Sequence, residues 1–179
     1  MEPFPLTIRS AVPADAAGVA RVYVESWQDT YPGVLSPHLL LGMSVERQTG
    51  RWRAAICQGE IVLAAHHDTH GIVGMASLGR ARDRSLGFDG EVYTLYVAPS
   101  FLGMGAGRKL LSASFAELTK RGCKSCIIWA HAKNNARFFY EAMGGRLVAQ
   151  RAARMMGDPV PEAGFGWKTL ELAEKSAAR

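Results

Sequence analysis

The feature that most constrains the fold is a run of three alternate glycines, Gly103–Gly107, between two strongly patterned segments. The preceding segment, Glu91–Val97, is rich in β-branched and aromatic residues and predicts a strand. The following segment, Arg108–Lys120, predicts a helix that ends at a glycine. A second aliphatic strand follows at Cys126–Ala130. This order predicts a parallel strand–helix–strand crossover over residues 91 to 130.

Weaker patterns along the rest of the chain predict the remaining elements. Serine before proline or before an apolar repeat marks two helix starts, and alternating aliphatics mark strands. The expected strands are Leu6–Arg9, Glu60–Ala65, Ile72–Leu78, Arg146–Arg151 and Phe165–Leu172, and the expected helices are Pro13–Trp27, one beginning at Ser36, one from Ser44 to Cys57, and Ala136–Met143. The order indicates an α/β chain with a mixed sheet.

Length and composition favour an ordinary globular domain. The chain has 179 residues, 48% of them hydrophobic, and we expect one domain over residues 1–179 with a frayed tail at 173–179. No run of about 18 apolar residues predicts a membrane span, and the first ten residues lack a signal-peptide pattern. Three cysteines cannot form a disulfide framework, so we expect a reduced, cytoplasmic protein.

The charge balance favours an anionic partner. The chain carries 21 Lys and Arg against 16 Asp and Glu, a net charge of +5. The basic residues are scattered and follow no helix-turn-helix, zinc or RNA-binding pattern, so nucleic acid is not the expected partner. A metal site is not expected either, because His66, His67 and His70 have no cysteine and no carboxylate beyond Asp68 at ligand spacing.

The glycine run has the chemistry of a phosphate cradle. Glycine allows close approach to the backbone, and the free N–H groups that open the next helix favour an anion. Arg108 and Lys109 add positive charge there. The spacing differs from the dinucleotide-binding G-x-G-x-x-G motif, and no G-K-[ST] sequence is present. The alternative is a flexible strand–helix connection without a ligand.

Two motifs are similar to those of the GCN5-related N-acetyltransferases. Leu102–Gly107 (LGMGAG) resembles the family's Q/R-x-x-G-x-G/A signature after a strand, with leucine in place of the leading Gln or Arg. Asn134–Gly145 (NNARFFYEAMGG) resembles its N-x-A-x-x-F-Y-E-x-x-G-G/F segment. The resemblance runs from Leu6 to Leu172 in the family's element order.

The resemblance implies a fold and an activity. The fold would be a mostly antiparallel sheet of about six or seven strands, with a splayed parallel pair at the cofactor site and flanking helices. The activity would be acetyl transfer from acetyl-CoA to a primary amine of a small molecule or of a protein or peptide, by direct attack and without a metal. A non-catalytic acyl-CoA sensor is the alternative, suggested by Leu102. Homodimers are common in the family.

The resemblance also assigns roles to residues in the two motifs. Backbone groups would hold the pantetheine arm and the pyrophosphate, because that arm carries amides that pair like an added strand. Asn134 would hydrogen-bond the pantetheine, and the local rules equally allow it to cap the helix that follows. The implied cofactor-binding residues are Leu95, Tyr96, Val97, Gly103, Met104, Gly105, Ala106, Gly107, Arg108 and Asn134.

Catalytic roles follow from the same resemblance. Tyr140 would protonate the departing thiolate, and Glu91 would take the proton of the acceptor ammonium, directly or through a water. His131 is a rival base, because its ordinary pKa suits the task better. The acceptor would lie against the N-terminal helices, at Trp27, Tyr31 and the Ser36–Leu41 loop. Aromatics there could hold a cation, or could simply pack in the core.

Overall fold

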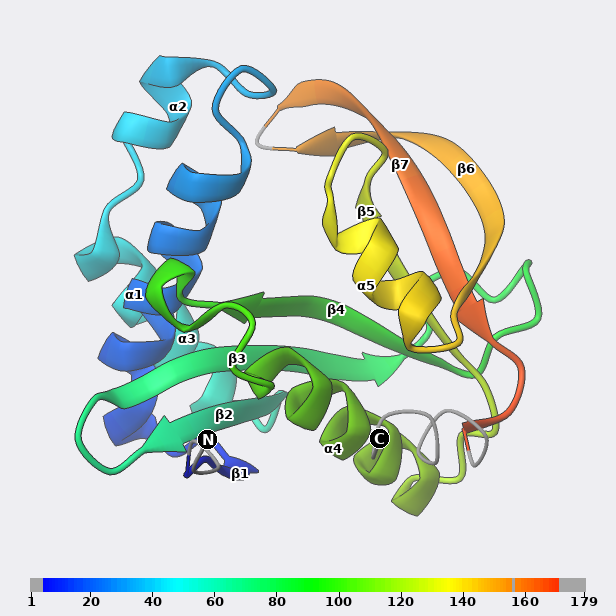
Figure 1. Ribbon diagram of the computed structural model, residues 1–179, viewed down its shortest axis with the longest axis horizontal. Helices are drawn as coiled ribbons and strands as arrows, with labels where there is room; N and C mark the ends of the chain where they lie inside the picture. Colours follow the sequence, from blue (N-terminus) through cyan, green and yellow to red (C-terminus); the bar gives the residue numbers. More distant parts are fainter. Residues whose placement is uncertain (1–4, 156, 171–179) are drawn as a thin grey trace.

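The protein, described by a computed structural model over residues 5–155 and 157–170, is built on a seven-stranded sheet (Figure 1). The strand order is β1-β2-β3-β4-β5-β7-β6. The strands are β1 (Thr7–Ser10), β2 (Ile61–His67), β3 (Gly71–Arg80), β4 (Gly90–Val97), β5 (Cys126–His131), β6 (Arg146–Met155) and β7 (Asp158–Trp167). The α-helices are α1 (Ala16–Thr30), α2 (Pro37–Leu41), α3 (Val45–Cys57), α4 (Ala106–Lys120) and α5 (Ala136–Ala142), with 3-10 turns at Pro13–Asp15 and Pro99–Phe101.

The sheet is antiparallel except at one place. β4 and β5 are parallel neighbours, and α4 is the crossover between them. The other neighbouring strands pair antiparallel. The predicted mixed sheet with one parallel pair and flanking helices is confirmed.

Helices cover the two faces of the sheet, and each face has its own core. Alternate residues of β2 point to opposite faces, so Val62 and Ala64 pack with α1 and α3, whereas Leu63 and Ala65 pack with α4. Tyr140 of α5 belongs to the core on the α4 side. α1 and α4 therefore lie on opposite sides of β4.

The parallel pair comes apart soon after it begins. Among the described residues, β4 pairs with β5 only from Gly90 to Val92, opposite Cys126 to Ile128. At the same point the register between β3 and β4 slips: Ser77 pairs with Thr94 and Leu78 with Val92, so Tyr93 is the extra residue of a β-bulge. In Figure 1, β5 and β7 run steeply away from β4. On its β5 side, the remainder of β4, from Tyr93 to Val97, faces an opening instead of a neighbouring strand.

The last predicted strand, Phe165–Leu172, is wrong in its bounds. β7 spans Asp158–Trp167 and forms a hairpin with β6. Two prolines argue against a strand here, since proline cannot donate to a ladder. Pro159 and Pro161 are nevertheless tolerated in β7. β7 pairs with β5 only from Glu162 onwards, so the two prolines have a neighbouring strand, β6, on one side only. Leu170 is already helical.

Other predicted bounds need small changes. α4 begins at Ala106, two residues before the expected start, and α1 extends to Thr30. The predicted frayed tail at 173–179 lies outside the described residues. No helix within residues 5–155 and 157–170 is long and apolar enough to cross a bilayer.

Candidate active site

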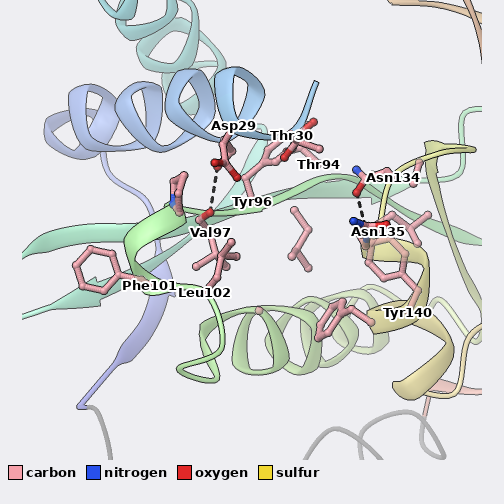
Figure 2. A pocket seen from close by; sticks show the side chains of 18 of the residues that line it. Asp29, Thr30, Thr94, Tyr96, Val97, Phe101, Leu102, Asn134, Asn135 and Tyr140 are labelled. Atoms are coloured by element: carbon pink, nitrogen blue, oxygen red, sulfur yellow. Dashed lines mark hydrogen bonds between the residues drawn. The ribbon is translucent and has the colours of Figure 1, made fainter. Parts of the chain in front are cut away.

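A pocket of about 650 Å³ occupies the opening between β4 and β5. Its lining begins at the glycine loop before α4, continues along β4 and α5, and reaches the C-terminal end of α1. Figure 2 shows Asp29 and Thr30 on the α1 side of β4, and Tyr140 on the other side of the strand. Because α1 and α4 cover opposite faces, the pocket joins the two faces of the sheet through the splayed strands.

The loop at one end of the pocket leaves backbone donors free for a ligand. Gly103 and Gly105 have φ values of 77° and 86°, which side chains of L residues rarely adopt. Gly105 is the N-cap of α4, and no side chain in the described structure accepts a hydrogen bond from the first turn. The first N–H groups of α4 therefore point at the pocket with only solvent or a ligand to accept them.

Charge and space at this loop suit an anion. Arg108 is exposed in the first turn and lines the pocket, and its neighbour Lys109 is exposed too. Gly107 lies against the Phe139 ring: a Cβ on Gly107 would stand 3.5 Å from the Phe139 Cζ atom. Met104 and Ala106 do not line the pocket, and Ala106 is buried. Of the six loop residues expected to hold pyrophosphate, Gly103, Gly105, Gly107 and Arg108 line it.

β4 presents backbone polar groups to the pocket. The Ala98 N–H donates to the carbonyl of Val73 on β3, at 2.9 Å. Hydrogen bonding alternates along antiparallel strands, so the polar groups of Leu95 and Val97 are directed away from β3. The Val97 carbonyl accepts from Ser26 Oγ at 3.1 Å (Figure 2). Leu95, Tyr96 and Val97, which the family resemblance assigns to the pantetheine arm, all line the pocket.

Tyr140 and Asn134 lie together on the α5 side of the pocket (Figure 2). Tyr140 is only 4% exposed and packs against Phe139, Phe165 and Trp167. This burial raises the pKa of the Tyr140 phenol, which keeps its proton at neutral pH. Asn134 lines the same wall. Its Oδ1 accepts from the Ala136 N–H at 2.8 Å, so Asn134 satisfies an opening N–H group of α5, although the N-cap residue itself is Asn135.

Glu91 is not among the lining residues, and its carboxylate is already occupied. It is 2% exposed. Its Oε2 accepts from the backbone N–H of Arg82 at 2.9 Å, and its Oε1 accepts from Arg82 Nε at 3.0 Å and also from Nη2. Direct contact between Glu91 and an acceptor amine is therefore not part of this geometry.

His131, the rival base, is also outside the lining. Its Nδ1 accepts from the Lys133 N–H at 3.1 Å, so its proton resides on the other ring nitrogen. Burial, with Lys133 nearby, lowers the pKa of His131 and favours the neutral ring. The ring packs edge-on against Tyr31, 6.4 Å between centroids.

The two aromatic residues predicted for the acceptor side have different places. Tyr31 lines the pocket together with Tyr96 and Asn134. Burial raises the pKa of the Tyr31 phenol. Trp27 lies behind it in the α1–α3 core, at 5.1 Å between ring centroids. The Ser36–Leu41 segment, which is α2 with its Ser36 cap, does not line the pocket.

Sequence reasoning missed several lining residues. Of the described residues that line the pocket, one is a carboxylate, Asp29, and two are cations, Arg108 and Lys133. Trp129 lines the β5 side, with the Arg151 guanidinium 3.8 Å above its ring centroid. The missed residues with polar, charged or aromatic side chains are Ser26, Asp29, Thr30, Tyr93, Thr94, Phe101, Trp129, Lys133, Asn135 and Phe139. The periodicity of the sequence predicts the helices and strands that contain these residues. It does not predict that β4 and β5 diverge and so expose them to the pocket.

The described residues contain no group of three or more His, Cys, Asp and Glu side chains placed to hold a metal ion.

Comparisons with known proteins agree with this architecture. The family model described as "Acetyltransferase (GNAT) family" matches residues 20–144. An uncharacterized N-acetyltransferase of Bacillus subtilis, YuaI, is 30% identical over 165 residues, which are 92% of this chain and 94% of that protein.

Solved structures with 21–22% identity share the fold. A GCN5-related N-acetyltransferase from Rhodopseudomonas palustris has a TM-score of 0.73, with 93% of this chain and 97% of that chain covered. YncA of Salmonella typhimurium, solved with acetyl-CoA, has a TM-score of 0.67 with 93% and 94% covered. PaiA of Thermoplasma acidophilum, solved with coenzyme A, has a TM-score of 0.64 with 89% and 98% covered.

The family match spans more than half of the chain, and the sequence motifs, the splayed strands and the uncapped glycine loop agree with it. The chain thus belongs to the GNAT family of acetyltransferases.

Proposed function

We propose that this protein is an N-acetyltransferase that transfers the acetyl group of acetyl-CoA to a primary amine of a small molecule or of a protein or peptide, by direct attack. The observation that carries the proposal is the continuous pocket, with an uncapped glycine loop, a buried tyrosine along one wall and a carboxylate on the α1 side of β4. Its volume lies in the usual range for small-molecule sites, about 300–1,000 Å³.

The residues at the loop fit the coenzyme. The N–H groups that begin at Gly105 would hold the diphosphate, with Arg108 supplementing the charge. The backbone groups of Leu95 and Val97 would pair with the amides of the pantetheine arm, and Asn134 would add a side-chain hydrogen bond. This support comes from both walls of the splay, so the thioester would be directed to the middle of the pocket.

Tyr140 supplies the proton that the reaction needs. The amine nitrogen attacks the thioester carbonyl carbon, the carbon–sulfur bond breaks, and the sulfur leaves with the electron pair. A neutral phenol with a raised pKa holds its proton until a thiolate develops beside it. Its apolar neighbours Phe139 and Phe165 keep water away from that proton.

The acceptor enters from the α1 end of the pocket. Asp29 is exposed there and attracts an ammonium group, and Tyr31 with Tyr96 forms an aromatic wall beside it. Because Glu91 and His131 do not line the pocket, the ammonium loses its proton to water at this open end. The acceptor therefore reacts as the free amine.

Two measurements test the proposal. Calorimetry should show binding of CoA and acetyl-CoA, and release of free thiol should depend on added amine from a panel of small amines and peptides.

Tyr140→Phe should lower kcat by about 10²-fold or more while CoA affinity stays within about twofold, because the phenol acts only when the thiolate forms. An unchanged rate of the chemical step in Tyr140→Phe would remove Tyr140 from the mechanism.

The alternative, an acyl-CoA sensor, is suggested by Leu102, which is exposed at the loop where the family pattern has Gln or Arg. Binding of CoA with no amine-dependent thiol release from any member of the panel would favour the sensor. Absence of CoA binding would contradict both functions.

A further inference from the structure

The β-bulge at Tyr93 coincides with the place where β4 leaves β5. Pairing to β5 stops at Val92, and the extra residue in the β3–β4 ladder is the next one. A bulge bends its strand and increases the local twist. The direction of β4 along the pocket, from Thr94 to Val97, is therefore set by whatever fixes Tyr93.

Tyr93 is held on β3 by its ring and by its hydroxyl. The hydroxyl donates to the Arg80 carbonyl at 2.7 Å. The ring lies over Gly79: a Cβ at that position would stand 2.5 Å from the Tyr93 hydroxyl and 3.2 Å from two ring carbons. Gly79 has an ordinary backbone conformation, so the glycine is needed for the space it leaves to the ring.

Glu91, two residues before Tyr93 in β4, also contributes to holding the Tyr93 ring. The Arg82 guanidinium lies 4.9 Å from the Tyr93 ring centroid, over the ring. Glu91 holds that guanidinium and the Arg82 backbone N–H with both of its oxygens. The Arg82 side chain is 61% exposed while Glu91 is 2% exposed, so a surface arginine is fixed by a buried carboxylate.

We propose that Glu91, Arg82 and Gly79 are positioning residues that clamp Tyr93 in the bulge and thereby aim the open edge of β4 at the acyl group. Glu91 then acts through Arg82 and Tyr93, and it takes no proton from the acceptor. The catalytic consequence rests on the proposed N-acetyltransferase function. The clamp itself is a feature of the strand, with its own readout.

Gly79→Ala is the sharpest test, because the new methyl meets the far end of a side chain and leaves the sheet backbone intact. We expect displacement of the Tyr93 ring and a fall in kcat of about tenfold or more, since small misplacement of reacting groups costs up to about 10²-fold. The affinity for CoA, measured by calorimetry, should stay within about twofold, because the phosphate loop lies at the other end of β4.

Tyr93→Phe provides the rescue. It removes the hydroxyl, which makes the closest contact with an added Cβ, so Gly79→Ala combined with Tyr93→Phe should be faster than Gly79→Ala alone. Gly50→Ala is the matched control: it places a methyl in open space on α3 and should leave kcat unchanged. Tyr93→Leu, which removes the ring, should reproduce the loss of kcat if Gly79→Ala does not fold.

Glu91→Gln distinguishes a positioning role of Glu91 from a role as general base. In the clamp, Glu91→Gln and Gly79→Ala release the same ring, so the double variant should be about as slow as the slower single variant. A Glu91 that acted as base would make the two losses multiply. Multiplied losses, an unchanged kcat in folded Gly79→Ala, or a loss confined to CoA affinity would each overturn the proposal.

Hydrogen exchange keeps the test independent of activity. Backbone amides 93–97 should exchange faster in Gly79→Ala and Tyr93→Leu than in the unmodified protein, and Gly50→Ala should not change them. If the unmodified protein acetylated no amine, the proposed function would fail while this measurement still decided the clamp. Unaltered exchange at 93–97 in both variants would refute the clamp even in an active enzyme.

Discussion

α3 begins at Ser44, whose side chain accepts the Arg47 N–H at 3.3 Å, whereas α4 begins at Gly105, a left-handed glycine with no side chain to offer. The first turn of α3 contains Glu46 beside Arg47, whereas the first turn of α4 contains Arg108 and no acid. An acid near a helix N-terminus complements the helix dipole, and a base opposes it. The two helices, of 13 and 15 residues, thus differ at their starts: α3 has a side-chain cap and an acid, and α4 has neither.

The difference separates a helix start with an opening N–H group capped by its own sequence from one whose opening N–H groups have no side-chain cap. α3 satisfies an opening N–H group from its own sequence and gains stability from it. α4 leaves its opening N–H groups without a side-chain cap within the described structure, and Arg108 beside them lines the pocket. An anion bound at this loop would supply the hydrogen-bond acceptor and the negative charge that the first turn of α4 lacks.

The largest expected effect is that of Gly105→Ala. The substitution forces a non-glycine residue into φ +86° and disturbs the N–H groups of the cradle. We expect CoA affinity to fall by about 10- to 100-fold, the value of one hydrogen bond to a charged group, measured by calorimetry.

Gly59→Ala is the control for Gly105→Ala. Gly59 follows α3 with φ +85° and has open space around it, so its substitution carries the same backbone strain far from the pocket. It should lower stability without changing CoA affinity. Equal losses of affinity in the two variants would show that the α4 start has no special role.

Arg108→Glu should have the next largest effect, and it moves stability and binding in opposite directions. CoA affinity should fall by about tenfold, because like charges then face each other at the loop. The free protein should gain about 0.3–1 kcal/mol in its free energy of unfolding, because an acid suits the first helical turn. Calorimetry and urea unfolding give the two quantities, and a variant that lost both would contradict the comparison.

Ser44→Ala tests the other helix. Loss of the cap should lower the free energy of unfolding by about 1 kcal/mol, measured in urea. CoA affinity and kcat should remain unchanged, since α3 does not line the pocket. A loss of CoA affinity after Ser44→Ala would mean that the two helix starts are coupled.

The smallest expected effect is that of Glu46→Gln. Removing one favourable charge from the exposed first turn of α3 should cost about 0.3–1 kcal/mol of unfolding free energy at low salt, and less at high salt. A difference that persisted at high salt would point to a cause other than the helix dipole.

Much of the site near α4 could be predicted because its signals are local. Three alternate glycines after a strand indicate a turn and an open helix start, and Ser44 before an apolar repeat indicates a capped one. The same reasoning predicted Asn134 beside Ala136, and its Oδ1 does accept the Ala136 N–H. In each case the interacting groups lie within a few residues of one another, so the pattern contains the geometry.

The remainder depended on contacts between distant segments. The sequence suggested a base at Glu91, and the structure instead places a fixed Arg82 over it, brought there by the loop between β3 and β4. Asp29 and Trp129 became pocket residues through the splay of β4 from β5. The prolines of β7 are tolerated because β5 ends before it reaches them.

The elements, the helix starts and the glycine-rich loop are legible in the amino-acid sequence, because backbone propensity and capping act over one or two turns. The side chains that line the pocket and the pairing of the Glu91 carboxylate emerge only in the folded chain, because burial and ion pairing depend on how strands separated in sequence diverge in space. For this protein that divergence is the short β4–β5 pairing, three residues long on each strand, followed by the bulge at Tyr93.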